Sequence, residues 1–404
     1  MKMRKTMVFA LTGLLLFSLL TGCGIVEGPN QWGRIKEPEA PNISVSDDFS
    51  PIQNGHEQFS PLADTQAAEG AERKSLYDLI FEALDNNSAA ISLYDVPEAE
   101  VTKAYEQLVY EHPEFFWADH GYSWTVTSGV GRTIIELKPK LAESMDTIAD
   151  KRQQLDAAVD AILADIPAAA TDYEKALYVH DYLVLNTEYD SAAYARIQAS
   201  PDQSFLDDAD TAYGCIVNHL AVCDGYAKAF HLLMNRLGIE AGRVFGIADG
   251  ESHAWNYIAL DGDYYYVDVT WDDPVAVDGS AVENNIVSHE YFCITTDSLL
   301  LDHSITDNAF YVPNCTALAY EYFRYHGLFL ESYSMAGVED LIVNKSADDS
   351  VQIEFGSQSE LQEAITQLFD HQEIFEIPYV QEHFTKVWRS VGHSGCVLTI
   401  RLYE

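Results

Sequence analysis

AVCDGYAKAF, residues 221–230, places a cysteine directly before a stretch with the spacing of an α-helix. The apolar side chains that follow are four, three and four residues apart, as on one helical face: Tyr226, Phe230, Leu233 and Leu237. Gly238 then provides the residue type that commonly ends a helix in the left-handed conformation. We therefore expect Cys223 at the N-cap or in the first turn of a helix.

The position of Cys223 gives it two possible roles. Free backbone N–H groups and the positive end of the helix dipole favour a thiolate, the form of cysteine that acts as a nucleophile. A free cysteine is also often a small, buried, unreactive residue. The segment by itself leaves both roles open.

A β-hairpin is predicted thirty residues after Cys223. ESHAWNYI (residues 251–258) and YYYVDVT (residues 264–270) have the composition of strands. Between them, Asp261-Gly262 is a strong signal for a two-residue turn.

The hairpin register predicts a contact between a histidine and a carboxylate. With the turn at Asp261-Gly262, Trp255 lies opposite Asp268, and His253 shares their face of the sheet on a diagonal. Diagonal neighbours are roughly 7–8 Å apart at the backbone, within reach of an imidazole and a carboxylate. One extra residue in the turn would place them on opposite faces. The hairpin thus predicts a carboxylate that orients a histidine, as a nucleophile–base arrangement needs.

AVCDGYAKAF, SHAWNYI and YYYVDVTWDDP, in this order, resemble the three motifs of the transglutaminase-like superfamily. The resemblance runs from about Tyr173 to about Cys293. It implies an α+β fold with a papain-like core, in which a helix carrying the cysteine packs on an antiparallel sheet. It further implies Cys223 as nucleophile, His253 as general base and then acid, and Asp268 as the orienting carboxylate. Because the superfamily includes cross-linkers, proteases, amidases and inactive members, the resemblance leaves the reaction open.

The N-terminus has the features of a bacterial lipoprotein. Lys2, Arg4 and Lys5 precede an apolar run over residues 7–20, which is too short to span a bilayer comfortably. Leu-Thr-Gly-Cys at residues 20–23 resembles a lipobox, which implies lipidation at Cys23, cleavage after residue 22 and an extracytoplasmic location at the membrane. The alternative is an uncleaved anchor helix.

The charge of the chain is strongly negative. The formal net charge is −41, and removal of residues 1–22, which carry three basic side chains and no acid, gives −44. Such a surface repels nucleic acid, so we expect a protein or peptide partner and no nucleic acid. Asp207-Asp208-Asp210 and Asp272-Asp273 lack the spacing of a calcium loop, and no cofactor or metal is expected.

The cysteines place few constraints on the fold. With Cys23 lipidated, an odd number remains, so at least one thiol is free or pairs between chains. A free Cys223 agrees with a nucleophile. Cys215 is the rival thiol, but no comparable helix follows it, and we interpret it as structural. The four cysteines other than Cys223 can form two bridges in three ways, or none: Cys215, Cys293, Cys315 and Cys396.

Composition and periodicity divide the rest of the chain. We expect a signal peptide over residues 1–22, a flexible linker over 23–70, an N-terminal α/β module over 71–145, a transglutaminase-like core over 146–318 and a C-terminal α+β module over 319–404. In the N-terminal module, the aromatic run at residues 115–117 is expected in the core.

Several residues near the motifs have predicted structural or catalytic roles. Thr171 and Glu174 form a capping box, and His180, on the apolar stripe of the helix that follows, is interpreted as a hydrogen-bonded core residue. Residues 190–214 form a long loop beside the catalytic segment, a possible lid. Asn218 or Tyr213 are candidates for a second oxyanion donor beside the Cys223 backbone N–H.

These observations predict a membrane-anchored cysteine enzyme of transglutaminase-like type. It would hydrolyse or transfer protein or peptide amide bonds, with hydrolysis favoured because nothing in the sequence marks an amine site. The alternative is a cell-surface binding or structural lipoprotein that keeps this fold without turnover.

Overall fold

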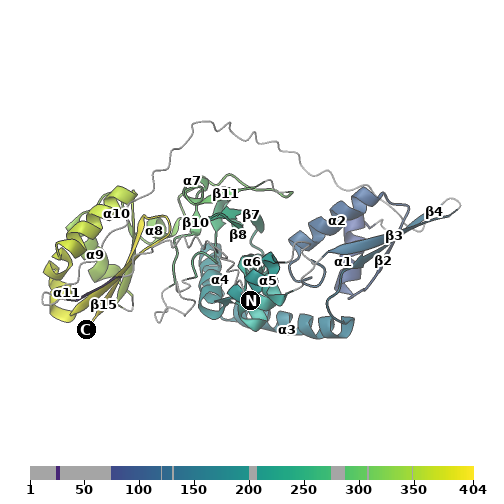
Figure 1. The fold of residues 1–404 in the computed structure, drawn as a ribbon, viewed down its shortest axis with the longest axis horizontal. Helices are drawn as coiled ribbons and strands as arrows, with labels where there is room; N and C mark the ends of the chain where they lie inside the picture. The colour runs from purple at the N-terminus through teal and green to yellow at the C-terminus, as the bar shows by residue number, and fades with distance from the viewer. Residues whose placement is uncertain are drawn as a thin grey trace, which may run out of the picture. The chain divides into compact units, whose positions relative to one another are not determined.

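The computed structural model describes residues 74–404, except residues 120, 130–131, 200–206, 274–286, 307–308 and 348, and in addition the backbone of residues 24–27. The signal peptide, Cys23 and nearly all of the expected linker lie outside the described residues. The chain forms two compact units (Figure 1). Of the described residues, one unit comprises residues 74–327, and the other comprises residues 328–404 together with residues 24–27. The expected boundary at residue 318 stays a prediction.

The first part of the larger unit is the expected α/β module. Helices α1 (Leu76–Asp85) and α2 (Glu98–Glu111) accompany a three-stranded antiparallel sheet. Its strands, in spatial order, are β2 (Ile91–Tyr94), β4 (Arg132–Pro139) and β3 (Tyr122–Gly129). Strand β2 is only four residues long and precedes a helix.

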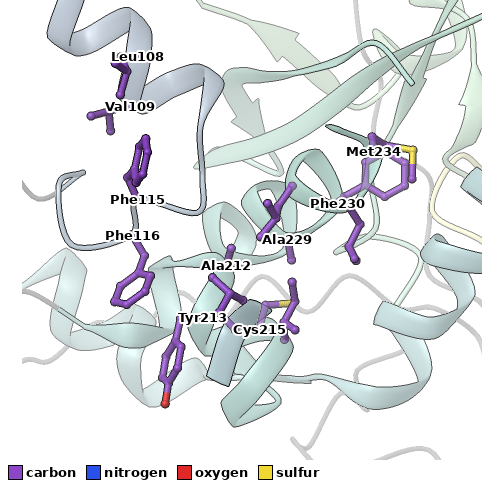
Figure 2. Close-up of a cluster of buried hydrophobic side chains, with 14 of the residues drawn as sticks. Leu108, Val109, Phe115, Phe116, Ala212, Tyr213, Cys215, Ala229, Phe230 and Met234 are labelled. Carbon is purple, nitrogen blue, oxygen red and sulfur yellow. The ribbon is translucent and has the colours of Figure 1, made fainter. Parts of the chain in front are cut away.

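The aromatic run at residues 115–117 joins this module to the rest of the unit. Its three side chains are buried, as expected of core residues. Figure 2 shows side chains of residues 108–116 in one apolar cluster with those of residues 212–215 and of the helix that begins at Cys223. The rings of Phe116 and Tyr213 are 5.3 Å apart. The N-terminal module and the core domain therefore share one hydrophobic core.

A five-stranded antiparallel sheet forms the centre of the core domain. Its spatial order is β10 (Phe292–Ile294), β9 (Asp263–Val267), β8 (Glu251–Leu260), β7 (Ala241–Ala248) and β11 (His303–Ile305). The sequence predicted β8 and β9. Strand β11 lies at the edge beside β7, far in sequence from the hairpin that it adjoins.

Helices pack against this sheet and one another. Helix α3 (Met145–Ala164) leads into α4 (Asp172–Asn186), whose capping box at Thr171 and Glu174 is present as predicted. Helix α6 (Cys223–Leu237) contacts α4, β7 and β8, and it ends at Gly238 with φ +71°. The residues of the possible lid include a helix, α5 (Ser191–Gln198).

Gly225 allows close packing at the start of α6. A Cβ atom at this position would lie 2.3 Å from the carbonyl oxygen of Ala209 and 3.0 Å from the Cβ of Ala221. Ala209 belongs to a 3₁₀ turn at Asp208–Asp210, and its carbonyl also accepts a hydrogen bond from the Val222 backbone N–H at 2.8 Å. The turn therefore contacts the first residues of the helix directly.

Gly225→Ala is expected to destabilise the protein by about 2–3 kcal/mol, because the backbone of the turn has to move. At an unconstrained helix position the same substitution usually stabilises, by up to about 1 kcal/mol. The sign of the change in the free energy of unfolding, measured by urea denaturation, decides between these outcomes. A neutral or stabilising result would contradict the close contact.

The C-terminal unit is an α+β module, as expected. Its sheet contains β14 (Lys386–Val391), β15 (Val397–Tyr403), β13 (Ser350–Phe355) and β12 (Phe329–Leu330), in this spatial order. Strand β1 (Gly24–Glu27) pairs antiparallel with β14. The main helices of the unit are α9 (Met335–Lys345), α10 (Gln358–Ile365) and α11 (Pro378–His383). None of the helices within the described residues has the length and apolarity needed to span a bilayer.

Candidate active site

Cys223 is the first residue of α6. Val222 is the N-cap and provides no side-chain cap, so the backbone N–H groups of the first turn are not used by a capping side chain. The residue is 8% exposed, and its thiol is free. The prediction that a helix begins at Cys223 is therefore confirmed.

The other cysteines of the described chain are also free, so no disulfide forms among them. Cys215 is fully buried, and burial raises the pKa of its thiol to about 12. Its sulfur lies 3.5 Å from the Thr187 hydroxyl. These properties agree with a structural cysteine that is not a competing nucleophile.

The hairpin has the predicted register. Leu260 pairs with Asp263, and each pair from there to Asn256 and Val267 follows in step. Continuing the same register places Trp255 opposite Asp268, just beyond the last paired residue of β9. The two-residue turn thus carries His253 and Asp268 to the same face.

His253 bridges the cysteine and the carboxylate. Its Nε2 lies 2.6 Å from Oδ2 of Asp268, and its side chain also forms a hydrogen bond with Cys223. Because Nε2 faces Asp268, the nitrogen available to the sulfur is Nδ1. Burial alone would lower the pKa of His253, but the charge of Asp268 and its hydrogen bond outweigh burial, and the Cys223 sulfur adds to them. The pKa is raised to about 10.

Asp268 is held by four donors. Oδ1 accepts the backbone N–H groups of Thr270 and Trp271, both at 3.1 Å, while Oδ2 faces His253. Oδ2 also lies 3.1 Å from Nε2 of His303. Burial opposes ionisation of Asp268, but the two imidazoles outweigh burial and hold the pKa of its carboxyl well below the usual range. The carboxylate is therefore ionised and fixed in direction.

His303 is the residue of the site that the sequence did not reveal. It lies at the start of β11, and its second nitrogen, Nδ1, contacts the carboxylate of Asp302. Burial alone would lower its pKa, but Asp268 and Asp302 raise it. Nothing in the local sequence distinguishes His303, because only the pairing of β11 with β7 brings it to Asp268.

The stability of the protein is expected to fall as pH rises from about 6.5 to about 10. The folded-state pKa of His253 is raised to about 10 from an ordinary value near 6.5. Its contribution is therefore complete below the unfolded value and is lost as pH rises through the folded value. His303 contributes with the same sign. The melting temperature of His253→Gln, measured over this range, should fall less than that of the wild type. Parallel curves would contradict a raised pKa at His253.

A buried ion cluster fixes the residue after the cysteine. Asp224 pairs with Lys228, one turn along α6, and with Arg243 on β7, whose Nη1 is 3.1 Å from Oδ1. Lys228 is 4% exposed and also pairs with Asp119 of the N-terminal module. Lys228 thus ties the start of α6 to Asp119 and, through a hydrogen bond at 2.7 Å, to the backbone carbonyl of Asp210.

Both candidates for the second oxyanion donor already donate a hydrogen bond to another side chain. The Tyr213 hydroxyl donates to Gln154 at 3.0 Å, and the Asn218 amide donates to Asp208 at 3.3 Å. Tyr189 is closer to the site. Burial raises the pKa of its phenol, and the charges of Cys223 and Asp268 act in the same direction.

A cleft of about 420 Å³ lies where the N-terminal module meets the core domain. Four of its lining residues are acidic: Glu143, Asp190, Asp207 and Asp208. Ala209, whose carbonyl contacts the start of α6, is also part of the lining. The cleft therefore reaches the elements that hold Cys223.

The family comparison agrees with this geometry. Residues 160–269 match the model of the transglutaminase-like superfamily, and this range contains Cys223, His253 and Asp268. Residues 160–269 form a transglutaminase-like domain. The resemblance predicted from the three motifs is confirmed, as is the mixed α+β fold with a papain-like core.

The chain is also similar to individual proteins. The chain is 26% identical to the human (Homo sapiens) kyphoscoliosis peptidase over an alignment of 204 residues. The alignment covers 47% of this chain and 29% of that protein. The mouse (Mus musculus) kyphoscoliosis peptidase is 24% identical over 202 residues, with the same two shares. The chain thus matches less than a third of the length of these curated relatives.

Among solved structures, the crystal structure of a TGase has 15% sequence identity to this chain. The similarity covers 45% of this chain and 51% of the other, with a TM-score of 0.27.

Proposed function

We propose that this protein is a cysteine enzyme that breaks or transfers amide bonds of proteins or peptides, with Cys223, His253 and Asp268 as its catalytic residues. The single observation that carries the proposal is the continuous hydrogen-bonded connection from the thiol at the mouth of α6 through the imidazole to a buried carboxylate. A nucleophile, a base and a group that orients the base are thereby in contact.

In the first half of the proposed reaction, the Cys223 sulfur attacks the carbonyl carbon of an amide. The proton of the thiol is already held on Nδ1 of His253, so the sulfur attacks as a thiolate, and the positive charge on the ring is stabilised by Asp268 at Nε2. His253 then gives its proton to the leaving amine as the C–N bond breaks. The product of this half is a thioester on Cys223 and a free amine.

In the second half, His253 takes a proton from the acceptor, which attacks the thioester and releases the thiolate. Water as the acceptor gives hydrolysis, and a primary amine gives a new amide bond. We favour water, because no residue of the described site marks an amine-binding position. The strongly negative charge of the chain favours substrates with cationic side chains over anionic ones.

The proposed location is the outer surface of a bacterial membrane. This rests on the basic residues, apolar run and cysteine of residues 2–23, which lie outside the described structure. The test is to compare membrane and soluble fractions of cells that express wild type or Cys23→Ser. Release of the variant from the membrane fraction is expected, and retention equal to wild type would contradict a lipid anchor at Cys23.

Trapping of an acyl-enzyme tests the reaction. The chain is incubated with a mixture of peptides of different composition, quenched with acid and analysed by mass spectrometry. A peptide acyl group on Cys223 is expected in the wild type, and the identity of that group gives the donor side of the substrate. Adding a primary amine distinguishes transfer from hydrolysis. A wild-type chain that cleaves amides with no adduct on Cys223, and a Cys223→Ala chain equally active, would together end the proposal.

The alternative is a binding protein that keeps the fold without turnover. Alkylation by iodoacetamide at pH 6 separates the two. With His253 protonated beside it, Cys223 is expected to react faster than the other buried cysteines, whose pKa values are raised by burial: Cys215, Cys293 and Cys315. Equal, slow labelling of all four would favour the binding protein.

His303→Asn is expected to slow acylation of Cys223 by roughly 10-fold. Asp268 loses one of its four donors and becomes less well fixed. The substitution also removes a positive charge near His253. The pKa of His253 therefore rises, and the basic limb of the pH–rate profile moves to higher pH. A structural role alone would lower the rate without moving the profile. An unchanged rate and profile would show that His303 does not act on this site.

A further inference from the structure

A second group of histidine and aspartate side chains lies outside the proposed active site. His180 and Asp181 are consecutive residues of α4, and His289 lies just before β10. One ligand atom from each of the three lies within 4.8 Å of the other two. The apolar stripe of α4 predicts a hydrogen-bonded core role for His180, and the sequence predicts no contact between His180 and His289.

The three side chains converge on one carboxylate oxygen. Oδ1 of Asp181 is 3.0 Å from Nδ1 of His180 and 2.8 Å from Nε2 of His289. Metal–ligand bonds to nitrogen and oxygen of about 2.0–2.2 Å place neighbouring ligand atoms roughly 3 Å apart. The observed spacing therefore fits a single ion bound by two imidazoles and one carboxylate.

The outer nitrogen of His180 has the partner that metal-binding histidines usually have. Nε2 lies 3.1 Å from Oδ2 of Asp272, which is fully buried and whose two oxygens each accept the backbone N–H of Tyr291 at 3.1 Å. The carboxylate at Nε2 keeps a proton on that nitrogen, so an ion that displaces the proton of Nδ1 meets a lone pair directed toward Asp181.

The ring of His289 also faces Oδ1 of Asp181. Its ring stacks on Tyr322, with centroids 3.9 Å apart and planes at 6°. Its Nδ1 is buried and has no hydrogen-bond partner among the described residues, so Nε2, facing Asp181, is the one polar contact of this ring. The Asp181 side chain is 35% exposed, which gives an ion a route from solvent.

We propose that His180, Asp181 and His289 form a binding site for one divalent transition-metal ion of the zinc class. Two imidazole ligands favour such an ion over Ca²⁺ or Mg²⁺, which prefer oxygen ligands. The ion joins α4 to the segment before β10, and through Asp272 to the chain that carries Asp268. Its role is to hold His289, just before β10, against α4, and it takes no part in the proposed reaction.

Metal binding is measured on the full chain carrying Cys223→Ala, so that the thiol does not compete. The protein is treated with a chelator, dialysed against micromolar Zn²⁺, and analysed for bound zinc, with Ca²⁺ in a parallel arm. One zinc ion per chain and no calcium is expected. Bound zinc should also raise the melting temperature, because a ligand that binds only the folded state stabilises it.

Matched variants locate the ion. Asp181→Asn keeps the size of the side chain and removes the charge, and it should lower zinc affinity at least ~10-fold and abolish the rise in melting temperature. His289→Gln should do the same. His371→Ala, which removes an exposed imidazole of the C-terminal unit, should bind like the parent.

Three results would overturn the proposal. The first is no zinc bound by the parent, which would mean that protons alone hold the cluster together. The second is unchanged zinc binding in both Asp181→Asn and His289→Gln. The third is loss of the ion in His303→Asn but not in Asp181→Asn, which would place it on His253, Asp268 and His303, the other group with suitable spacing. These outcomes are independent of whether Cys223 forms an acyl-enzyme.

Discussion

Cys223→Ala is expected to lower the rate of amide cleavage or transfer by at least ~10³-fold. The reason is that no other group in the described site can form the covalent intermediate. His253 and Asp268 remain in contact in this variant, so the fold and the melting temperature should change little. The measurement is the initial rate on the peptide identified by acyl-enzyme trapping.

Cys215→Ala is the matched control for this experiment. It removes a thiol that is eight residues away in sequence, fully buried and of raised pKa. We expect a loss of about 1 kcal/mol in stability from the small cavity and an unchanged rate. A Cys215→Ala chain as inactive as Cys223→Ala, with the same fold, would mean that the nucleophile is wrongly assigned.

Asp268→Asn is expected to lower the same rate by about 10³–10⁴-fold while leaving Cys223 in place. An amide at this position no longer stabilises the positive charge on His253. It also presents an NH₂ group to one of four donors, each of which needs an acceptor: the backbone N–H groups of Thr270 and Trp271, and the rings of His253 and His303. Both the charge and the orientation of the imidazole are therefore lost.

The control for Asp268→Asn is Asp263→Asn. Asp263 begins the same strand, β9, and its side chain is exposed. This substitution removes the same charge from the chain, and the rate should stay within about twofold of wild type. If Asp263→Asn were as slow as Asp268→Asn, the loss would reflect the overall charge of the protein and not the contact with His253.

The sequence was most informative where a short local rule determines geometry. Helix α6 begins at Cys223 because an apolar face starts there and a glycine closes it. The contact between His253 and Asp268 follows from one two-residue turn, since strand side chains alternate and the turn sets the register. Both rules act over fewer than about twenty residues, so the fold around the site and three of its residues could be predicted without a structure.

The residues that the sequence missed reach the site through pairings distant along the chain. His303 contacts Asp268 only because β11 joins the edge of the sheet at β7, and no periodicity marks a three-residue strand. Lys228 is a charged residue of a predicted helix, yet it is buried, and it pairs with Asp119 of the N-terminal module and Asp224 of its own helix. His289 joins His180 and Asp181 across more than a hundred residues.

By itself, the sequence determined that this protein has a transglutaminase-like domain, where its helix with the thiol begins, and which imidazole and carboxylate share a face of the hairpin. The domain follows from the resemblance of the three motifs, and the other two features depend on local backbone preferences and on alternation along a strand. Only the tertiary structure decided that Asp268 holds two imidazoles, that all cysteines of the described chain are free, and that a second histidine–aspartate group lies beside α4. Such features depend on side-chain contacts between segments far apart in the chain, and local patterns carry no information about which distant segments meet.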